Sequence, residues 1–159
     1  MSIEFSVFDP GKTYAGRKQF DCEHAVINRF VHDSLASQVK KQLSVAYVLT
    51  DSEQNDRFAA FFTMAHHAID ASKRRKIPCA RLIMLGVDRA YKGQNLGRRL
   101  MKQALVITRQ SSTQLGCYGL YLDADPGAVA FYRKLGFLLL EGDKNPESSP
   151  MFMAVRSIG

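Results

Sequence analysis

One stretch of the sequence, residues 82–99, decides the fold, and it reads LIMLGVDRAYKGQNLGRR. Its apolar first part, residues 82–87, predicts a buried strand. Gly93, Asn95 and Gly97 then mark a turn, and the apolar periodicity that follows predicts a helix. Backbone N–H groups and the helix dipole attract negative charge at a helix N-terminus. This strand, turn and helix therefore predict a site for a ligand that carries phosphate.

Two common phosphate motifs do not fit this turn. A nucleotide P-loop has Lys and then Ser or Thr after its second glycine, whereas Gly97 is followed by Arg98 and Arg99. A dinucleotide-binding fold has Gly-x-Gly-x-x-Gly and an acidic residue about 20 positions later, and this sequence has neither. A phosphate ligand of this turn would therefore be of another kind, and the alternative is an ordinary strand-to-helix turn on a basic surface.

Residues 92–97, with Val87-Asp88 before them, resemble the pyrophosphate loop of the GNAT N-acetyltransferases, which bind acetyl-coenzyme A. The pattern of that loop is Gln/Arg-x-x-Gly-x-Gly/Ala. Here Lys92 stands at the first position and Asn95 at the fourth. Among non-glycine residues, Asn tolerates left-handed backbone angles well, so we expect the turn to form. Its side chain can crowd the pyrophosphate, which leaves the affinity for the cofactor open.

A second motif lies at residues 125–137, which read DPGAVAFYRKLGF. It predicts a short helix, with Asp125 as N-cap and Gly136 as the left-handed residue after the end. The Ala-Phe-Tyr-x-x-x-Gly-Phe signature is similar to the last motif of the GNAT family. The resemblance implies that Tyr132 lies beside the coenzyme A sulfur and donates a proton to the leaving thiolate. The alternative is that Tyr132 and Phe131 only pack the helix onto the sheet.

The resemblance also implies which residues hold acetyl-coenzyme A. The strand before the turn offers backbone groups to the pantetheine arm, and N–H groups of the turn hold the pyrophosphate. Tyr132 is the catalytic residue. The residues assigned to the cofactor are Leu85, Gly86, Val87, Lys92, Gly93, Gln94, Asn95, Leu96, Gly97, Arg98, Asp123 and Phe131.

Composition predicts a single globular domain over residues 1–159, since 46% of the residues are hydrophobic and 23% are charged. The apolar runs are shorter than a membrane span and no leader opens the chain, so we expect a soluble cytoplasmic protein with no membrane partner. Cys22, Cys79 and Cys117 fit neither a disulfide framework nor a C-x-x-C motif. We expect buried free thiols and no bound metal.

The net charge of +7 indicates a polyanionic partner. One basic cluster is residues 73–76, and another surrounds the phosphate turn. The second cluster can partly serve coenzyme A phosphates, whereas the first exceeds what one cofactor needs. The residues assigned to a polyanionic substrate are Lys73, Arg74, Arg75, Lys76 and Arg89. The alternative is that residues 73–76 form a solvated charged loop.

The remaining periodicity predicts a mixed α/β (α+β) fold. A first helix is expected after residues 20–24, with Asp21 as N-cap and Val26, Phe30 and Val31 on one face. Residues 71–78 are expected to be a loop or a short helix. Expected strands are residues 3–8, 45–50, 57–65, 80–87, 119–123, 137–140 and 151–155, and further helices are residues 35–41, the stretch from the turn to about Ser112, and 125–135. This order matches the GNAT fold, a mostly antiparallel sheet of about six or seven strands flanked by about four helices.

Segments outside the two motifs resemble the acetyltransferase toxins of bacterial toxin–antitoxin pairs. They are FDC at 20–22, NRF at 28–30, AYVL at 46–49, FFTM at 61–64 and PMFMAVRSI at 150–158. The resemblance implies acetyl transfer from acetyl-CoA to the α-amino group of aminoacyl-tRNA, which blocks translation. It also implies neutralisation by a ribbon–helix–helix antitoxin, and a homodimer.

The sequence offers no evident general base. An α-amino group titrates at about 7.7–8.0 and a lysine at about 10.4, so the missing base favours an α-amine acceptor. His66 and His67 are adjacent in an expected strand, so only one can point toward the cleft. Two alternatives stay open: an N-acetyltransferase of a small amine or a protein N-terminus, and a non-catalytic module that binds nucleic acid or antitoxin. The positive charge argues against cationic amines and aminoglycosides.

Overall fold

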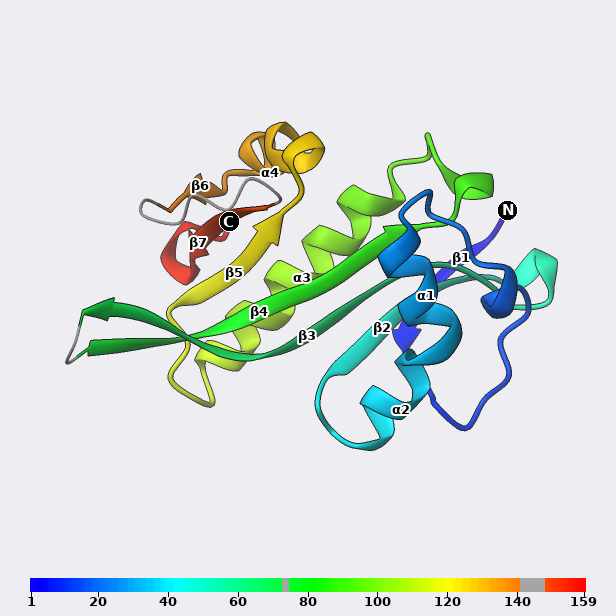
Figure 1. Cartoon of the computed structure of the whole chain (residues 1–159), viewed down its shortest axis with the longest axis horizontal. Coiled ribbons are helices and arrows are strands. Elements are labelled where there is room, and N and C mark those ends of the chain that lie inside the picture. Colours follow the sequence, from blue (N-terminus) through cyan, green and yellow to red (C-terminus); the bar gives the residue numbers. More distant parts are fainter. Residues whose placement is uncertain (73–74, 141–147) are drawn as a thin grey trace. The chain divides into compact units, whose positions relative to one another are not determined.

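The computed structural model describes residues 1–72, 75–140 and 148–159. Seven strands form one sheet in the order β1-β2-β3-β4-β5-β7-β6 (Figure 1). The strands are β1 Ile3–Val7, β2 Val45–Asp51, β3 Arg57–Ser72, β4 Arg75–Val87, β5 Gly119–Ala124, β6 Leu138–Leu139 and β7 Ser149–Ala154. The α-helices of the described residues are α1 Ala25–Asp33, α2 Leu35–Lys40, α3 Leu96–Ser112 and α4 Val129–Leu135. The predicted fold class is confirmed.

The chain forms two compact units. The first unit consists of Met1–Ala65 and Met84–Lys102, and the second of His66–Ile83 and Gln103–Gly159. Strands β3 and β4 and helix α3 contribute residues to both units. The expected single acetyltransferase domain therefore stays a prediction.

In the first unit, β1, β2 and the start of β3 pair antiparallel. Ile3 lies opposite Asp51 in the first pair, and Val45 lies opposite Met64 in the second. The turn between β2 and β3 contains two residues with positive φ, Asn55 at 60° and Asp56 at 55°. The predicted hairpin is confirmed, and β3 extends beyond the expected end.

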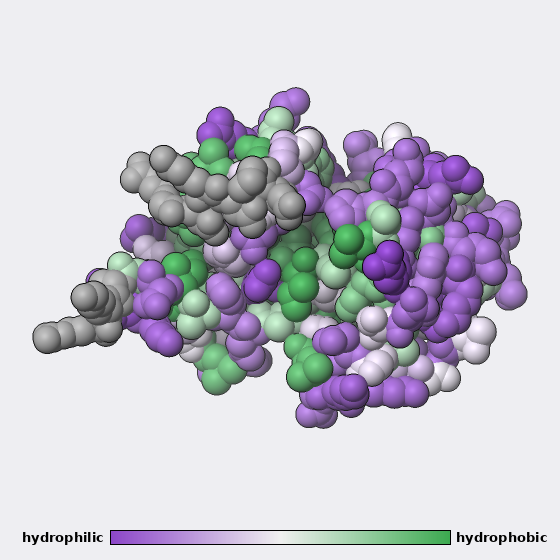
Figure 2. Space-filling view, in the orientation of Figure 1, coloured by the Kyte–Doolittle hydropathy of each residue, from purple (hydrophilic) through white to green (hydrophobic). Residues whose placement is uncertain are grey.

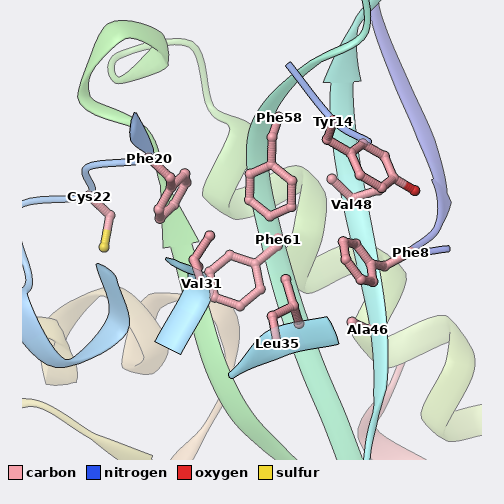
Figure 3. Close-up of a cluster of buried hydrophobic side chains, with 10 residues drawn as sticks. All are labelled: Phe8, Tyr14, Phe20, Cys22, Val31, Leu35, Ala46, Val48, Phe58 and Phe61. Atoms are coloured by element: carbon pink, nitrogen blue, oxygen red, sulfur yellow. The ribbon is translucent and has the colours of Figure 1, made fainter. Parts of the chain in front are cut away.

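Aromatic side chains fill the core of the first unit (Figure 3). Phe20 meets Phe58 edge to face, with ring centroids 5.3 Å apart. Helices α1 and α2 place Val31 and Leu35 in the same cluster, both fully buried. The prediction for Val26 is wrong, because this side chain is 59% exposed. A helix turns 100° per residue, and its buried face here runs through Val31.

The predicted N-cap of α1 is also wrong. His24 occupies the cap, and its Nδ1 accepts a hydrogen bond from the backbone N–H of Ile27 at 3.4 Å. The Asp21 carboxylate instead accepts hydrogen bonds from the backbone N–H of Glu23 and the side chain of Asn28. The chain between Asp21 and the helix is therefore a turn closed by Asp21, not the first turn of α1.

In the second unit, β5 runs parallel to β4 and antiparallel to β7, and β6 pairs with β7. Leu120, Leu122 and Met151 are buried. On β4 Leu82 and Gly86 are buried, but Ile83 is 40% exposed, so the predicted buried strand is wrong in this detail. Ile83 lies on the opposite face of the strand from Leu82 and Gly86.

Residues 71–78 differ from the expected loop or short helix. Strand β3 continues to Ser72 and β4 begins at Arg75, so the described residues of this stretch are extended strands. Lys73 and Arg74 lie outside the described residues. A strand whose side chains are exposed needs no alternation of apolar and polar residues. The exposed Arg75 and Lys76 can therefore lie in β4.

The second motif forms a 3₁₀ turn, Pro126–Ala128, followed by α4. Asp125 precedes the turn, but its side chain makes no capping hydrogen bond, in contrast to the prediction. Gly136 ends the helix with φ 106°, as predicted.

In Figure 2 hydrophilic residues cover most of the visible face. Within the described ranges, no helix combines the length and apolarity needed to cross a membrane.

Candidate active site

The turn between β4 and α3 carries the phosphate-loop motif. Asp88 follows β4, a 3₁₀ turn spans Arg89–Tyr91, and α3 begins at Leu96. Gly93 and Asn95 both have left-handed backbone angles, with φ of 81° and 60°. An added Cβ at Gly93 would meet nothing within 4 Å, so the positive φ rather than crowding favours glycine there. The expected left-handed Asn95 is confirmed.

Asp88 fixes the start of this turn. Its backbone N–H donates to the Ala59 carbonyl at 2.8 Å. Its buried carboxylate accepts hydrogen bonds from the N–H of Ala90 at 2.9 Å and of Asp21 at 3.1 Å. The N–H of Arg89 also donates to the Asp21 carbonyl at 2.8 Å. The turn is thus held by hydrogen bonds to β3 and to the segment that precedes α1.

Two cations of the turn already have acidic neighbours. Lys92 Nζ lies 3.1 Å from Glu23 Oε1 and donates to the Cys22 carbonyl at 3.3 Å. Arg89 Nε lies 3.7 Å from Asp21 Oδ2. The N–H of Glu23 and the amide of Asn28 hold the pKa of Asp21 below its usual value. Exposed pairs of this kind contribute little to stability, so both cations can turn toward a phosphate at small cost.

The end of β4 supplies the residues expected at the pantetheine arm. Leu85 and Val87 are half-buried, and Gly86 is buried. A Cβ at Gly86 would lie 3.2 Å from both Cys22 Sγ and Ile27 Cγ2, which is tighter than ordinary packing contacts. A larger residue would have to displace these side chains, so the close approach of Cys22 and Ile27 favours glycine here.

Tyr132 lies in α4 with 9% of its surface exposed. Its ring meets those of Phe131 and Phe137 edge to face, at 5.2 and 5.7 Å. Burial, and secondarily the charge of Asp125, raise the pKa of Tyr132 to about 12. The hydroxyl is therefore protonated at neutral pH and can act as a proton donor, but not as a base.

A family model described as the acetyltransferase (GNAT) family matches residues 25–137, which include both motifs. The chain belongs to this family. The predictions of a GNAT-family protein and of an acyltransferase are confirmed.

Solved structures similar to the acetyltransferase include bacterial toxins. A crystal structure of a bacterial toxin is 31% identical with a TM-score of 0.90, and the match covers 99% of this chain and 93% of that one. A mutant of the toxin AtaT, bound to the C-terminus of the antitoxin AtaR and acetyl-CoA, is 24% identical with a TM-score of 0.88, covering 98% and 95%. AtaT complexed with acetyl-methionyl-tRNAfMet is 24% identical with a TM-score of 0.88, covering 99% and 97%. At 24% identity the AtaT structures support the fold alone.

The predicted site residues of the acetyltransferase fall in both units. The first unit contains the strand end, the turn and Arg89, whereas the second contains Tyr132, Phe131, Asp123, Arg75 and Lys76. Gly93, Gln94, Asn95 and Arg98 are exposed, as are Arg75 and Lys76, while Leu96 is buried and Gly97 is half-buried. The structure thus groups the turn residues with one another and groups Tyr132 with Phe131.

Sequence reasoning missed a network on β3, β4 and β5 of the acetyltransferase. Asp123 accepts hydrogen bonds from Arg81 Nη2 at 3.0 Å and from the Tyr121 hydroxyl at 2.9 Å. His67 stacks on Tyr121 with centroids 4.6 Å apart, whereas His66 is exposed. Burial, and then the charge of Arg81, lower the pKa of His67. The alternation of side chains along each strand could have indicated which residues share a face. It does not give the register between β4 and β5, and this register places Arg81 opposite Tyr121.

The cysteines of the acetyltransferase are free thiols, as expected. Cys22 and Cys79 are buried as predicted, whereas the prediction of burial is wrong for Cys117, which is half-buried. Burial raises the pKa of Cys79 to about 11, so this thiol is not a nucleophile at neutral pH. In the described part of the chain, no three His, Cys, Asp or Glu side chains gather as a metal site would require.

Proposed function

We propose that this chain is an acetyl-CoA-dependent toxin that acetylates the α-amino group of aminoacyl-tRNA and so blocks translation. The observation that carries the proposal is the turn at Gly93 and Asn95, with its left-handed angles at the N-terminus of α3. The family match and the 31% identity to a bacterial toxin support it. The AtaT complex with acetyl-methionyl-tRNAfMet supports an aminoacyl-tRNA acceptor by analogy.

The turn fits a diphosphate on geometric grounds. The space next to Gly93 is open, and Gly93, Gln94 and Asn95 are exposed, so backbone N–H groups there are accessible to a ligand. A helix N-terminus adds favourable electrostatic potential for an anion. In this proposal the turn holds the pyrophosphate, with Lys92 and Arg98 beside it.

Acetyl-CoA supplies the acetyl group as a thioester. The backbone of Leu85, Gly86 and Val87 orients the pantetheine arm and polarises the thioester carbonyl. A fraction of α-amines is neutral near pH 7, and such an amine would form the new bond to the acetyl carbon and release one proton to solvent. Tyr132, protonated at neutral pH, would give its proton to the departing sulfur and regain one from solvent. Phe131 and Asp123 complete the assigned cofactor site.

The partners follow from the same proposal. Arg75, Lys76 and Arg89 contact the tRNA, together with Lys73 and Arg74. A ribbon–helix–helix antitoxin neutralises the toxin, as the AtaT–AtaR complex suggests by analogy. The protein acts in the cytoplasm as a homodimer with one domain per chain. Co-expression with the product of the neighbouring reading frame, followed by size-exclusion chromatography with light scattering, tests the antitoxin and the dimer.

Transfer of labelled acetyl groups tests the reaction. The purified protein is incubated with labelled acetyl-CoA and charged tRNA, deacylated tRNA or a peptide with a free N-terminus. We expect label on charged tRNA alone, and a fall of about 10²- to 10⁴-fold in rate for Tyr132→Phe. Tyr14→Phe is the matched control and should keep its activity. Label on the peptide in place of charged tRNA would identify a protein N-terminal acetyltransferase, and equal rates for Tyr132→Phe and wild type would contradict the proton-donor role.

A further inference from the structure

A depression of about 390 Å³ lies on the second unit, outside the residues assigned to acetyl-CoA. Its lining consists of Ala71, Arg75, Lys76, Ile77, Pro78 and Tyr118. Two of these six residues are cations, three are small or apolar, one is aromatic, and none is acidic. Arg75 and Lys76 are both exposed, so their charges face the solvent at this depression.

Tyr118 is the unusual member of this lining, because 47% of it is exposed although it is a large aromatic residue. Its backbone is fixed on both sides: its N–H donates to the Pro78 carbonyl at 2.8 Å, and its carbonyl accepts from Val155 N–H at 2.9 Å. Its ring stacks on Phe152 with centroids 5.7 Å apart and planes 18° apart. The ring is thus held in one orientation while nearly half of the residue stays accessible.

A third cation lies beside the same ring. The guanidinium carbon of Arg156 is 6.0 Å from the centroid of Tyr118, and its Nη2 donates to the Tyr118 hydroxyl at 3.5 Å. Arg156 is exposed, so its charge also faces the solvent. The depression therefore combines an aromatic surface with two lining cations, and a third cation lies beside its aromatic ring on the same unit of the chain.

This combination matches the chemistry of a single-stranded nucleotide. A base stacks on an aromatic ring, and the phosphates on either side pair with Arg and Lys. A solvated basic loop has no need of an exposed, immobilised tyrosine, and the bases of a duplex are not available for stacking. We infer that the depression binds an unpaired nucleotide of the charged tRNA, with its base on Tyr118 and its phosphates at Arg75 and Lys76. The inference rests on the proposed function in taking the substrate tRNA as the source of that nucleotide.

Binding of a short RNA tests the inference without any catalytic step. The probe is a single-stranded RNA with one 2-aminopurine, whose fluorescence falls when the base stacks; the same RNA as a duplex is the comparison. We expect quenching with wild type and with Tyr118→Phe. Tyr118→Ala should lose the quenching and bind roughly 5- to 100-fold more weakly. Arg75→Ala and Lys76→Ala should each reduce the slope of log K against log salt by about 0.7.

Lys40→Ala is the matched control for the charge variants, since Lys40 is an exposed lysine on α2 in the first unit. It should bind the probe as wild type does. Thermal unfolding of Tyr118→Ala checks that loss of the Phe152 contact has not unfolded the protein, and Tyr118→Phe gives the same comparison with the ring kept. A folded Tyr118→Ala variant that binds and quenches like wild type would overturn the inference.

Other outcomes separate the inference from the proposed function. If Tyr118→Ala acetylates charged tRNA with unchanged KM, the inference fails and the proposed function stands. If wild type stacks the probe through Tyr118 but transfers no acetyl group to charged tRNA, the nucleotide site stands and the proposed function fails. If the RNA does not bind and an acidic peptide binds in a Tyr118-dependent way, the depression is a protein-binding surface and the inference is overturned.

Discussion

Asp88 connects two segments that are 67 positions apart in the sequence. Its carboxylate accepts backbone hydrogen bonds from Asp21 and Ala90, and only 3% of the residue is exposed. The Val-Asp pair before the turn pointed to Asp88, but its partner Asp21 was expected to cap a helix. The two roles differ because a cap depends on local sequence, whereas this contact depends on how the chain folds back.

Replacement of Asp88 by Ala tests this connection. The change leaves the backbone N–H of Ala90 in the turn and that of Asp21 before α1 without their acceptor, so we expect a loss of about 1–3 kcal/mol in the free energy of unfolding. Acetyl-CoA should also bind more weakly, because the turn is no longer held in place. Urea denaturation and calorimetric titration measure the two effects. The control is Asp9→Ala, which removes one exposed hydrogen bond to Gly11 N–H, and an equal loss in both variants would refute the special position of Asp88.

Asn95 and Asn55 offer a matched pair of left-handed residues. Both have φ of 60°, but Asn95 lies in the phosphate turn and Asn55 in the turn between β2 and β3. Glycine adopts this angle freely, so each Asn→Gly change should alter stability by less than about 1 kcal/mol. Asn95→Gly should tighten acetyl-CoA binding, since it removes a side chain near the pyrophosphate, while Asn55→Gly should not. Isothermal titration calorimetry measures the affinity of each variant for acetyl-CoA. Weaker binding by Asn95→Gly would show that the Asn95 side chain contacts the ligand.

Among the elements of the second unit, β5 and β7 approach each other closely at Gly119. Gly119 pairs with Ala154, and an added Cβ at Gly119 would lie 2.2 Å from the Met153 carbonyl oxygen and 2.9 Å from Ala154 Cα. Both neighbours are backbone atoms, which cannot move aside as a side chain can. The sequence marked Gly119 as a strand start, but the reason for glycine lies in the partner strand.

Gly119→Ala should therefore destabilise the protein, by about 2 kcal/mol or more, because the β5–β7 ladder must separate to admit the methyl group. Gly127→Ala is the control: nothing lies within 4 Å of its added Cβ, so its effect should stay within about 1 kcal/mol. Differential scanning calorimetry compares the midpoint temperatures of unfolding of the two variants. Equal midpoints for Gly119→Ala and Gly127→Ala would mean that the strands can shift without cost.

At the scale of the whole molecule, the chain is a strongly basic protein whose buried tyrosine has a raised pKa. Folding raises the pKa of Tyr132 from 10.0 to about 12, chiefly through burial. The neutral phenol is therefore favoured in the folded state. Its contribution to stability is fully present below pH 10 and is lost as the pH rises toward 12.

This linkage predicts alkaline unfolding that depends on Tyr132. A difference of two pKa units corresponds to about 3 kcal/mol. Ionisation of Tyr132 should therefore lower the unfolding free energy of the wild type by up to this amount as the pH rises from about 10 to 12. Tyr132→Phe cannot ionise and should show a shallower decline in the same window. Urea denaturation at intervals of pH measures both slopes. Parallel curves would mean that Tyr132 titrates as it does in the unfolded chain.

Much of the fold was predictable from local pattern. Strand β2 is a mostly apolar run, β5 places the buried Leu120 and Leu122 on either side of Tyr121, and α3 keeps Leu96, Leu100 and Ala104 on its buried face. The strand structure of residues 75–78 was not predictable, because exposed strand residues such as Arg75 and Lys76 carry no periodic apolar signal. The Asn95 turn was predictable since its backbone angle depends on residue type.

The sequence alone determined the order of the elements, the family and the two motifs, because each depends on residues close together along the chain. The tertiary structure alone decided that Asp88 bonds to Asp21, that Arg81 and Tyr121 meet at Asp123, and that Tyr118 forms part of a basic depression. Those contacts join residues on different strands and loops. Their partners are set by strand register and chain reversal, which local residue preferences do not specify.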